Sequence, residues 1–202
     1  MWQKFKGKRL STKRCVDNII DVYRSASDSD LVNGCEWYEV AMQTTFGKKL
    51  KDMSEEDRMK AAGVIAAVSP LKSWSHNMEI ARSIIIDGKY EGHTNAMLNK
   101  ARRIMGLDAP NPGDIVDILS GDKIKSFFLN LIGHKSVVTI DRHAISICLG
   151  RSIGDNEGNI TSNQYLFFQR CYNIAADILG FKTPYELQAV TWLTWRRIKN
   201  EI

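Results

Sequence analysis

The sequence is poor in the features that mark metal-binding, secreted or membrane-bound proteins. Its 202 residues include only four cysteines, Cys15, Cys35, Cys148 and Cys171, and no two of them form a C-x-x-C pair. The four histidines are dispersed without ligand spacing, so we expect no metal and no cofactor. Most of the cysteines fall on apolar helical faces, which predicts buried free thiols in a reducing compartment.

Several other signals are also missing. There is no signal-peptide pattern and no apolar run of transmembrane length, so we expect a cytoplasmic protein without a membrane partner. The sequence has no Walker loop and no G-x-G-x-x-G motif, which argues against the common nucleotide-binding folds. We find no internal repeat and no convincing pairing of β-strands.

What remains is the composition of a globular helical protein with a modest positive charge. The 44% hydrophobic and 25% charged residues are ordinary for a soluble domain, and 202 residues can bury a sizeable core. We expect a single domain over 1–202, built as two helical lobes that share a cleft. The net charge of +5 is compatible with a polyanionic partner. Basic residues gather at the two ends of the chain: Lys4, Lys6, Lys8, Arg9, Lys13 and Arg14, then Arg196, Arg197 and Lys199.

Hydrophobic periodicity, capping residues and breakers predict about ten helices and an all-α fold. The expected helices span about 12–25, 30–46, 55–69, 75–87, 94–105, 111–119, 123–131, 141–149, 162–179 and 184–200. Gly47 should end the second helix, and Pro70 the third. The third helix is apolar on all sides, which predicts a central position.

The most informative stretch runs from 121 to 150. Gly133 ends one predicted helix, and a β-branched connector through Val137, Val138 and Ile140 leads to Asp141 at the start of the next. An acid at this position, followed by Arg142 and His143, has two interpretations. It caps its helix, as Asp commonly does, or it is an ionisable group placed for chemistry.

Three short motifs resemble the helix-hairpin-helix DNA glycosylases, the endonuclease III-like enzymes. Residues 119–123 (LSGDK) correspond to the hairpin, 140–144 (IDRHA) to the V-D-T-H-V segment and 149–151 (LGR) to the following helix end. Residues 64–70 (VIAAVSP) resemble an earlier helix end of the family. The hairpin lacks the second glycine, and Pro70 replaces the family's glutamine. The resemblance implies a two-lobed bundle with a helix-hairpin-helix-like motif and a cleft near 69–77 and 121–143.

The resemblance also implies roles for particular residues. Asp141 would stabilise the sugar cation or activate a nucleophile, and Lys123, with Lys125 as the alternative, would form a Schiff base. Trp37, Tyr38 and Trp74 would line a pocket for a flipped base, with Glu39 and Asn77 as polar readers. The residues expected to contact DNA are Lys72, Lys125, His134 and Lys135. Some relatives carry an iron–sulfur loop of four close cysteines, and the sequence has no such run.

Three functions follow from these observations. The first is a glycosylase, with or without lyase activity, that acts as a monomer on a damaged or modified base in double-stranded DNA. The second is an enzyme of the same fold that installs a substituent on a base. The third is a DNA-binding or inhibitor module on a scaffold that has lost catalysis, which the missing hairpin glycine and the missing glutamine favour.

Overall fold

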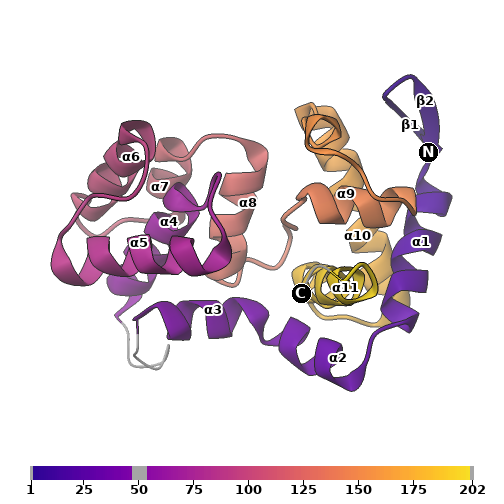
Figure 1. The fold of residues 1–202 in the computed structure, drawn as a ribbon, viewed down its shortest axis with the longest axis horizontal. Helices are drawn as coiled ribbons and strands as arrows, with labels where there is room; N and C mark the ends of the chain where they lie inside the picture. Colours follow the sequence, from indigo (N-terminus) through magenta and orange to yellow (C-terminus); the bar gives the residue numbers. More distant parts are fainter. Residues whose placement is uncertain (1, 47–53, 201–202) are drawn as a thin grey trace. The chain divides into compact units, whose positions relative to one another are not determined.

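The computed structural model of the protein describes residues 2–46 and 54–200, and it is mostly helical (Figure 1). Within these ranges the chain forms eleven α-helices, one short 3-10 helix and one two-stranded hairpin. The helices are α1 (Thr12–Arg24), α2 (Asp28–Cys35), α3 (Trp37–Phe46), α4 (Glu55–Val68), α5 (Trp74–Asp87), α6 (Asn95–Met105), α7 (Pro112–Ile118), α8 (Asp122–Leu131), α9 (Arg142–Leu149), α10 (Ser162–Leu179) and α11 (Pro184–Ile198). The 3-10 turn is η2 (Asp155–Glu157). The helical prediction is therefore confirmed in outline.

The helices begin where capping residues predicted that they would. The side chains of Ser11, Ser54 and Thr161 each accept a hydrogen bond from the backbone N–H three residues later. These bonds satisfy amides that have no partner inside the helix. The prediction of one helix over about 30–46 is wrong, because the chain forms α2 and α3 with a break at Glu36. Gly47, the expected helix end, lies outside the described residues.

The described residues divide into two compact units. Unit 1 is drawn from Met1–Trp37 and Lys135–Ile202, and unit 2 from Tyr38–His134. The chain therefore passes into unit 2 within α3 and leaves it shortly after α8. Unit 1 joins the two ends of the chain, whereas unit 2 is one continuous segment.

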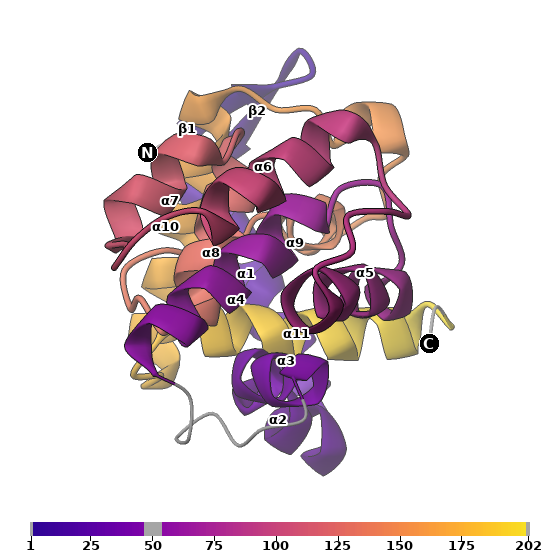
Figure 2. The ribbon, with the colours of Figure 1, turned by 90° about the vertical axis from the view of Figure 1, so that its left-hand side faces the viewer.

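Unit 2 is organised around α4, which packs against α5, α6 and α8 (Figure 2). Its residues from Ala61 to Val68 are all buried, which confirms the central position predicted from its apolarity. Gly63 permits a close approach, since a Cβ atom there would lie 2.9 Å from Ile115 Cγ2 and 3.1 Å from Ile104 Cγ2. Unit 2 thus has a core of its own.

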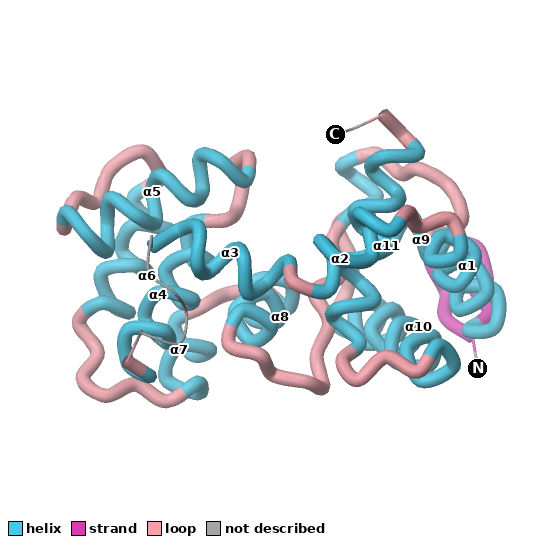
Figure 3. The backbone as a smooth tube through the Cα atoms, turned by 90° about the horizontal axis from the view of Figure 1, so that it is seen from below, coloured by secondary structure: helices cyan, strands magenta, loops and turns pink. Residues whose placement is uncertain are grey.

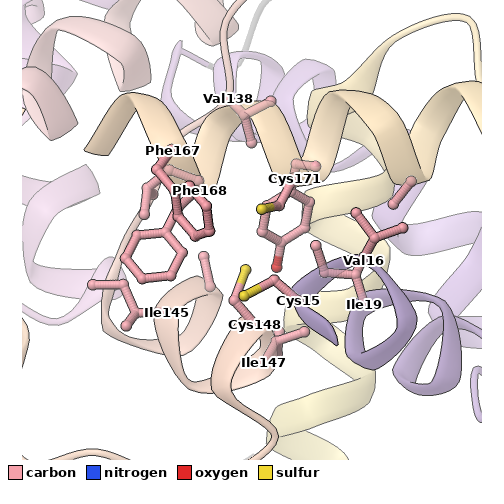
Figure 4. Packing of buried hydrophobic residues seen from close by; sticks show 14 of the residues in the cluster. Cys15, Val16, Ile19, Val138, Ile145, Ile147, Cys148, Phe167, Phe168 and Cys171 are labelled. Atoms are coloured by element: carbon pink, nitrogen blue, oxygen red, sulfur yellow. The ribbon is translucent and has the colours of Figure 1, made fainter. Parts of the chain in front are cut away.

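Unit 1 has a second core, formed where α1, α9, α10 and α11 pack together. Figure 4 shows Cys15, Cys148 and Cys171 meeting in this core beside Phe168. All three are free and buried, as predicted, whereas Cys35 is exposed. A hydrogen bond from the Cys171 thiol lowers the pKa of Cys15, and burial raises the pKa of Cys148 well above its usual range.

The N-terminal hairpin contradicts the expectation that the chain has no β pairing. Strands β1 (Trp2–Phe5) and β2 (Lys8–Ser11) pair antiparallel, and they are the magenta element in Figure 3. The two turn residues, Lys6 and Gly7, both have positive φ, as a two-residue hairpin turn requires. Phe5 is 3% exposed and packs edge-on against Phe168 of α10 at 5.7 Å, which fixes the hairpin to unit 1.

None of the helices in residues 2–46 and 54–200 combines the length and the apolarity that crossing a bilayer requires.

Candidate functional site

Asp141 lies at the end of a connector whose backbone is held by side chains of α10. Val138 and Ile140 are buried, and the Tyr165 hydroxyl bonds both of them. It accepts from the Ile140 N–H at 2.9 Å and donates to the Val138 carbonyl at 3.1 Å. The Gln169 amide donates to the same carbonyl at 2.9 Å. These bonds satisfy buried backbone groups of a segment outside regular structure, and they fix the position of Asp141.

The Asp141 carboxylate caps α9 and stays half-buried. Its Oδ1 accepts a hydrogen bond from the Ala144 N–H at 2.7 Å, and Oδ2 takes no part in that cap. Burial is the main cause that raises the pKa of the Tyr172 hydroxyl, and the negative charge of Asp141 adds to the rise. The Asp141 charge therefore affects the ionisation of Tyr172, a residue in the core of unit 1. Both interpretations of this acid, cap and functional group, fit this geometry.

Aromatic and basic side chains gather in the same unit around Trp192 of α11. The Trp192 cluster consists of Trp37, His143, Trp192 and Arg196, and all four side chains are half-buried. The Trp37 and His143 rings lie edge-on to Trp192, with centroids 6.0 Å and 6.2 Å away. The Arg196 guanidinium stacks over the Trp192 ring at 4.5 Å. His143 belongs to the first turn of α9, two residues after Asp141, so the cluster adjoins the capped end of that helix.

This arrangement offers three things that a nucleic-acid site uses. Partly exposed aromatic rings can stack on bases, and a guanidinium stacked on a ring can contact phosphate or base edges. A half-buried carboxylate can stabilise a developing positive charge or accept a proton. Asp141 and Trp37 are among the site residues predicted from the sequence, whereas Trp192 is missed and Arg196 is noted only as one of the basic residues near the end of the chain. Their i, i+4 spacing on α11 is the signal that could have found the pair.

The site residues predicted in unit 2 converge on α8. Tyr38 of α3 and Trp74, the first residue of α5, both contact the Phe127 ring of α8, at 6.3 Å and 6.4 Å between centroids. Tyr38 is 7% exposed and belongs to the core of unit 2, whereas Trp74 is half-buried. The structure therefore brings together two of the three predicted aromatic residues, while the third, Trp37, belongs to unit 1.

The two predicted polar readers have different surroundings. Asn77 is 2% exposed, and the amide orientation that satisfies its hydrogen bonds places the nitrogen 3.2 Å from the Ile65 carbonyl and 3.3 Å from the Val68 carbonyl. These bonds join α5 to the last turn of α4. Glu39 is exposed and accepts a hydrogen bond from Gln43 at 2.9 Å. Of the two, Glu39 is the one that a ligand can reach in this structure.

The predicted cations are mostly at the surface. Lys72, Lys123, His134 and Lys135 are exposed, and Lys125 is half-buried. Lys123 lies in the first turn of α8, after Gly121, whose φ of 84° makes the turn into the helix. Lys123 belongs to unit 2, whereas Asp141 belongs to unit 1. Across the described ranges there is no group of three or more His, Cys, Asp or Glu side chains that could hold a metal ion.

Comparison with known proteins identifies a family without assigning an activity. A family model described as "Family of unknown function (DUF7178)" matches residues 1–199. A search of curated proteins and a search of solved structures each found no match. Since the family model covers nearly the whole sequence, the chain belongs to the DUF7178 family.

Proposed function

We propose that the protein processes a base in DNA, as a glycosylase that breaks the N-glycosidic bond of a damaged or modified nucleotide. The observation that carries the proposal is the half-buried carboxylate of Asp141, which the Tyr165-bonded connector delivers to the start of α9 next to the Trp192 cluster. The motif resemblance of residues 119–123 and 140–144 supports the same reaction. The cleft near 69–77 and 121–143 that this resemblance implies stays a prediction.

In this mechanism Asp141 acts on the sugar, not on the base. Cleavage of the bond between C1′ and the base nitrogen leaves positive charge on the sugar, and the base departs with the bonding electrons. A carboxylate in a partly dehydrated position stabilises that charge more strongly than one in water. It also accepts a proton from the water that adds to C1′. The capping bond to Ala144 uses Oδ1, and Oδ2 is the atom proposed to face the sugar.

The remaining residues would hold the DNA. Trp37, Trp74 and the exposed ring atoms of Trp192 supply surfaces on which bases stack. Lys72, Lys125, His134, Lys135 and Arg196 supply charge for phosphates. Lys123 is proposed as the amine of a lyase step, in which it replaces water as the nucleophile at C1′.

Asp141→Asn is the decisive variant, because Asn caps a helix about as well as Asp. Base release from a panel of modified duplexes should fall by about a hundredfold or more in this variant, the range seen when one electrostatic contact to a transition state is removed. Its melting temperature should stay close to that of the wild type. Asp28→Asn, an equal change at the exposed first turn of α2, is the matched control and should leave base release unchanged.

Equal base release by the Asp141→Asn variant and the wild type would remove Asp141 from the mechanism. Borohydride trapping on abasic DNA tests the lyase step separately. Lys123→Gln should abolish trapping, whereas loss of trapping in Lys125→Gln alone would assign the step to the alternative lysine. Lys89→Gln, a change at an exposed lysine with no proposed role, is the control. Mass spectrometry of the treated DNA distinguishes a released base from a newly substituted one, which would instead favour the base-modifying enzyme.

A second candidate is a DNA-binding module without catalysis, which the capping bond of Asp141 and the exposure of Lys123 favour. In this candidate Asp141 serves only as a helix cap and Lys123 only as an exposed cation. This candidate predicts DNA binding with a steep salt dependence, no trapping and no base release.

A further inference from the structure

Unit 1 contains a pocket that the proposed DNA chemistry does not use. Its volume is about 390 Å³, within the range of small-molecule sites. It lies beside the C-terminal end of α9, about 12 Å along that helix from the end capped by Asp141. The lining residues are Phe5, Lys6, Lys8, Leu10, Arg14, Cys15, Cys148, Leu149, Arg151 and Glu157.

The rim of the pocket is basic, and part of it is held in place. Arg151 makes a two-bond ion pair with Glu157, at 2.7 Å and 3.2 Å. The Lys6 ammonium donates to the Asn156 carbonyl at 3.4 Å, which links the turn of the hairpin to η2. Lys8 and Arg14 approach from β2 and from the first turn of α1. Four cations against one carboxylate leave an excess of three positive charges.

The floor of the pocket is apolar. Phe5, Cys15 and Cys148 are each at most 3% exposed, and the half-buried Leu10 and Leu149 complete it. Burial keeps the Cys148 thiol neutral, because it raises the pKa well above the usual range. The partial negative charge at the end of α9 is reduced, since the Asn18 amide donates to the Cys148 carbonyl at 2.8 Å.

We infer that this pocket binds a small organic phosphate, in which an apolar or aromatic group lies on the floor and two or three negative charges meet the rim. An excess of three positive charges around a concave site favours such an anion. The guanidinium of Arg14 and the flexible ammonium groups of Lys6 and Lys8 are donors that suit phosphate oxygens, while Arg151, which is bonded to Glu157, adds charge to the rim. A nucleic-acid strand fits less well, because its phosphates need a track of cations and this rim encloses a floor of limited area.

The inference is tested by titrating the 202-residue chain, labelled with nitrogen-15, with adenosine 5′-diphosphate. Amide signals of residues 6–8, 14–15 and 149–151 should shift together. Adenosine should produce no shifts in the same concentration range, and inorganic phosphate should bind at least about tenfold more weakly, since each lacks half of the recognised chemistry. A short single-stranded oligonucleotide serves as the competing ligand.

Arg14→Gln should weaken binding of the diphosphate about tenfold, the usual effect of losing one charge-assisted hydrogen bond. Lys13→Gln is the matched control, because Lys13 is the adjacent cation on α1, pairs with Asp17 and does not line the pocket. Both side chains are exposed, so both variants should fold, and thermal unfolding checks this.

Four results would overturn the inference. The first is that the diphosphate shifts signals outside the pocket or shifts none. The second is that the Arg14→Gln and Lys13→Gln variants bind the diphosphate equally tightly, and the third is that adenosine binds as tightly as the diphosphate. The fourth is that the oligonucleotide displaces the diphosphate at a concentration below that of the diphosphate. None of these outcomes depends on Asp141, so the inference stands or fails independently of the proposed base chemistry.

Discussion

Unit 1 is formed by two segments that are far apart in the sequence, one N-terminal and one C-terminal, whereas unit 2 is formed by one continuous run of residues. In unit 1, specific polar bonds connect segments that are distant in the sequence, and we call these connections the joins of unit 1. Arg197 of α11 bonds Asp30 of α2 at 2.7 Å and the Ser25 carbonyl at 2.7 Å, and Asn18 of α1 bonds the Cys148 carbonyl. In unit 2 the centre is α4, whose buried face is alanine, valine, isoleucine and glycine.

This difference bears on where a precise site can form. Directional bonds fix the backbone to which they attach, while apolar packing tolerates small shifts of side chains. The connector before Asp141 is the clearest case, because Tyr165 holds two of its backbone groups. We therefore expect unit 1 to respond sharply to single substitutions at its joins and unit 2 to absorb comparable changes. The three predictions below test this contrast.

The largest effect is expected from adding one methyl group at a helix crossing in unit 1. A Cβ atom at Gly34 of α2 would lie 2.5 Å from Val190 Cα and 2.7 Å from Val190 N. Because these are backbone atoms of α11, two helices must separate, and Gly34→Ala should destabilise the protein by about 2 kcal/mol or more. Chemical unfolding followed by tryptophan fluorescence measures it, since Trp2, Trp37, Trp192 and Trp195 all belong to unit 1.

Gly63→Ala is the matched change in unit 2. Its new methyl group would lie 2.9 Å from Ile115 Cγ2 and 3.1 Å from Ile104 Cγ2, which are side-chain atoms and not the backbone of a neighbouring helix. The gain in helix propensity, about 1 kcal/mol, offsets part of the crowding, so we expect a smaller loss of stability than for Gly34→Ala. Equal destabilisation by Gly34→Ala and Gly63→Ala would remove the proposed contrast between the units.

The next effect concerns the connector that carries Asp141. Tyr165→Phe removes the acceptor of the buried Ile140 N–H, and an unsatisfied buried donor costs about 1–3 kcal/mol. Val138 is affected less, because Gln169 still donates to its carbonyl. Tyr172→Phe is the control, since the Tyr172 hydroxyl reaches Thr191 only at 3.5 Å, and its loss should cost less. Urea unfolding of the two variants gives the comparison, and a larger loss for Tyr172→Phe would contradict it.

Much of the helical framework could be predicted because its information is local. Capping residues such as Ser54, Asn111 and Thr161 lie next to the helices that they start, and their side chains make the expected bonds. The cap at Asp141 could be predicted in the same way, since a connector, a cap and a helix follow one another along residues 137–149. These signals need no knowledge of the rest of the fold.

The missed features depend on contacts between distant segments. The hairpin has charged strands without clear alternation, and its anchor, Phe5 on Phe168, joins residues far apart in the sequence. The break between α2 and α3 adjoins the close contact of Gly34 with Val190, another distant pair. The Trp192 cluster combines α3, α9 and α11, so no single window of sequence contains it. Tertiary contacts decided these features, and local propensity did not.

The smallest effect is a change of stability with pH at the join between α2 and α11. Burial raises the pKa of Asp30, but hydrogen bonds from Arg197 and Ser27 outweigh it and leave the pKa below its usual value. Below the usual Asp value of about 3.9, the unfolded chain therefore binds a proton more readily than the folded one. The stability that Asp30 contributes is fully present above that pH and is lost as the pH falls through the lower, folded pKa.

Asp30→Asn should therefore destabilise the protein at neutral pH by about 1.5 kcal/mol, the lower end of the range for hydrogen bonds to a charged group, because Arg197 is 42% exposed and water screens its charge. The difference from the wild type should shrink as the pH falls below about 4, because the wild-type carboxyl group then becomes protonated too. Urea unfolding of both proteins across this range isolates the Asp30 contribution, since all other carboxylates are shared. A difference that stays constant with pH would mean that the shape of the side chain, and not its charge, joins α2 to α11. The contrast between bonded joins in unit 1 and apolar packing in unit 2 would then lose its electrostatic part.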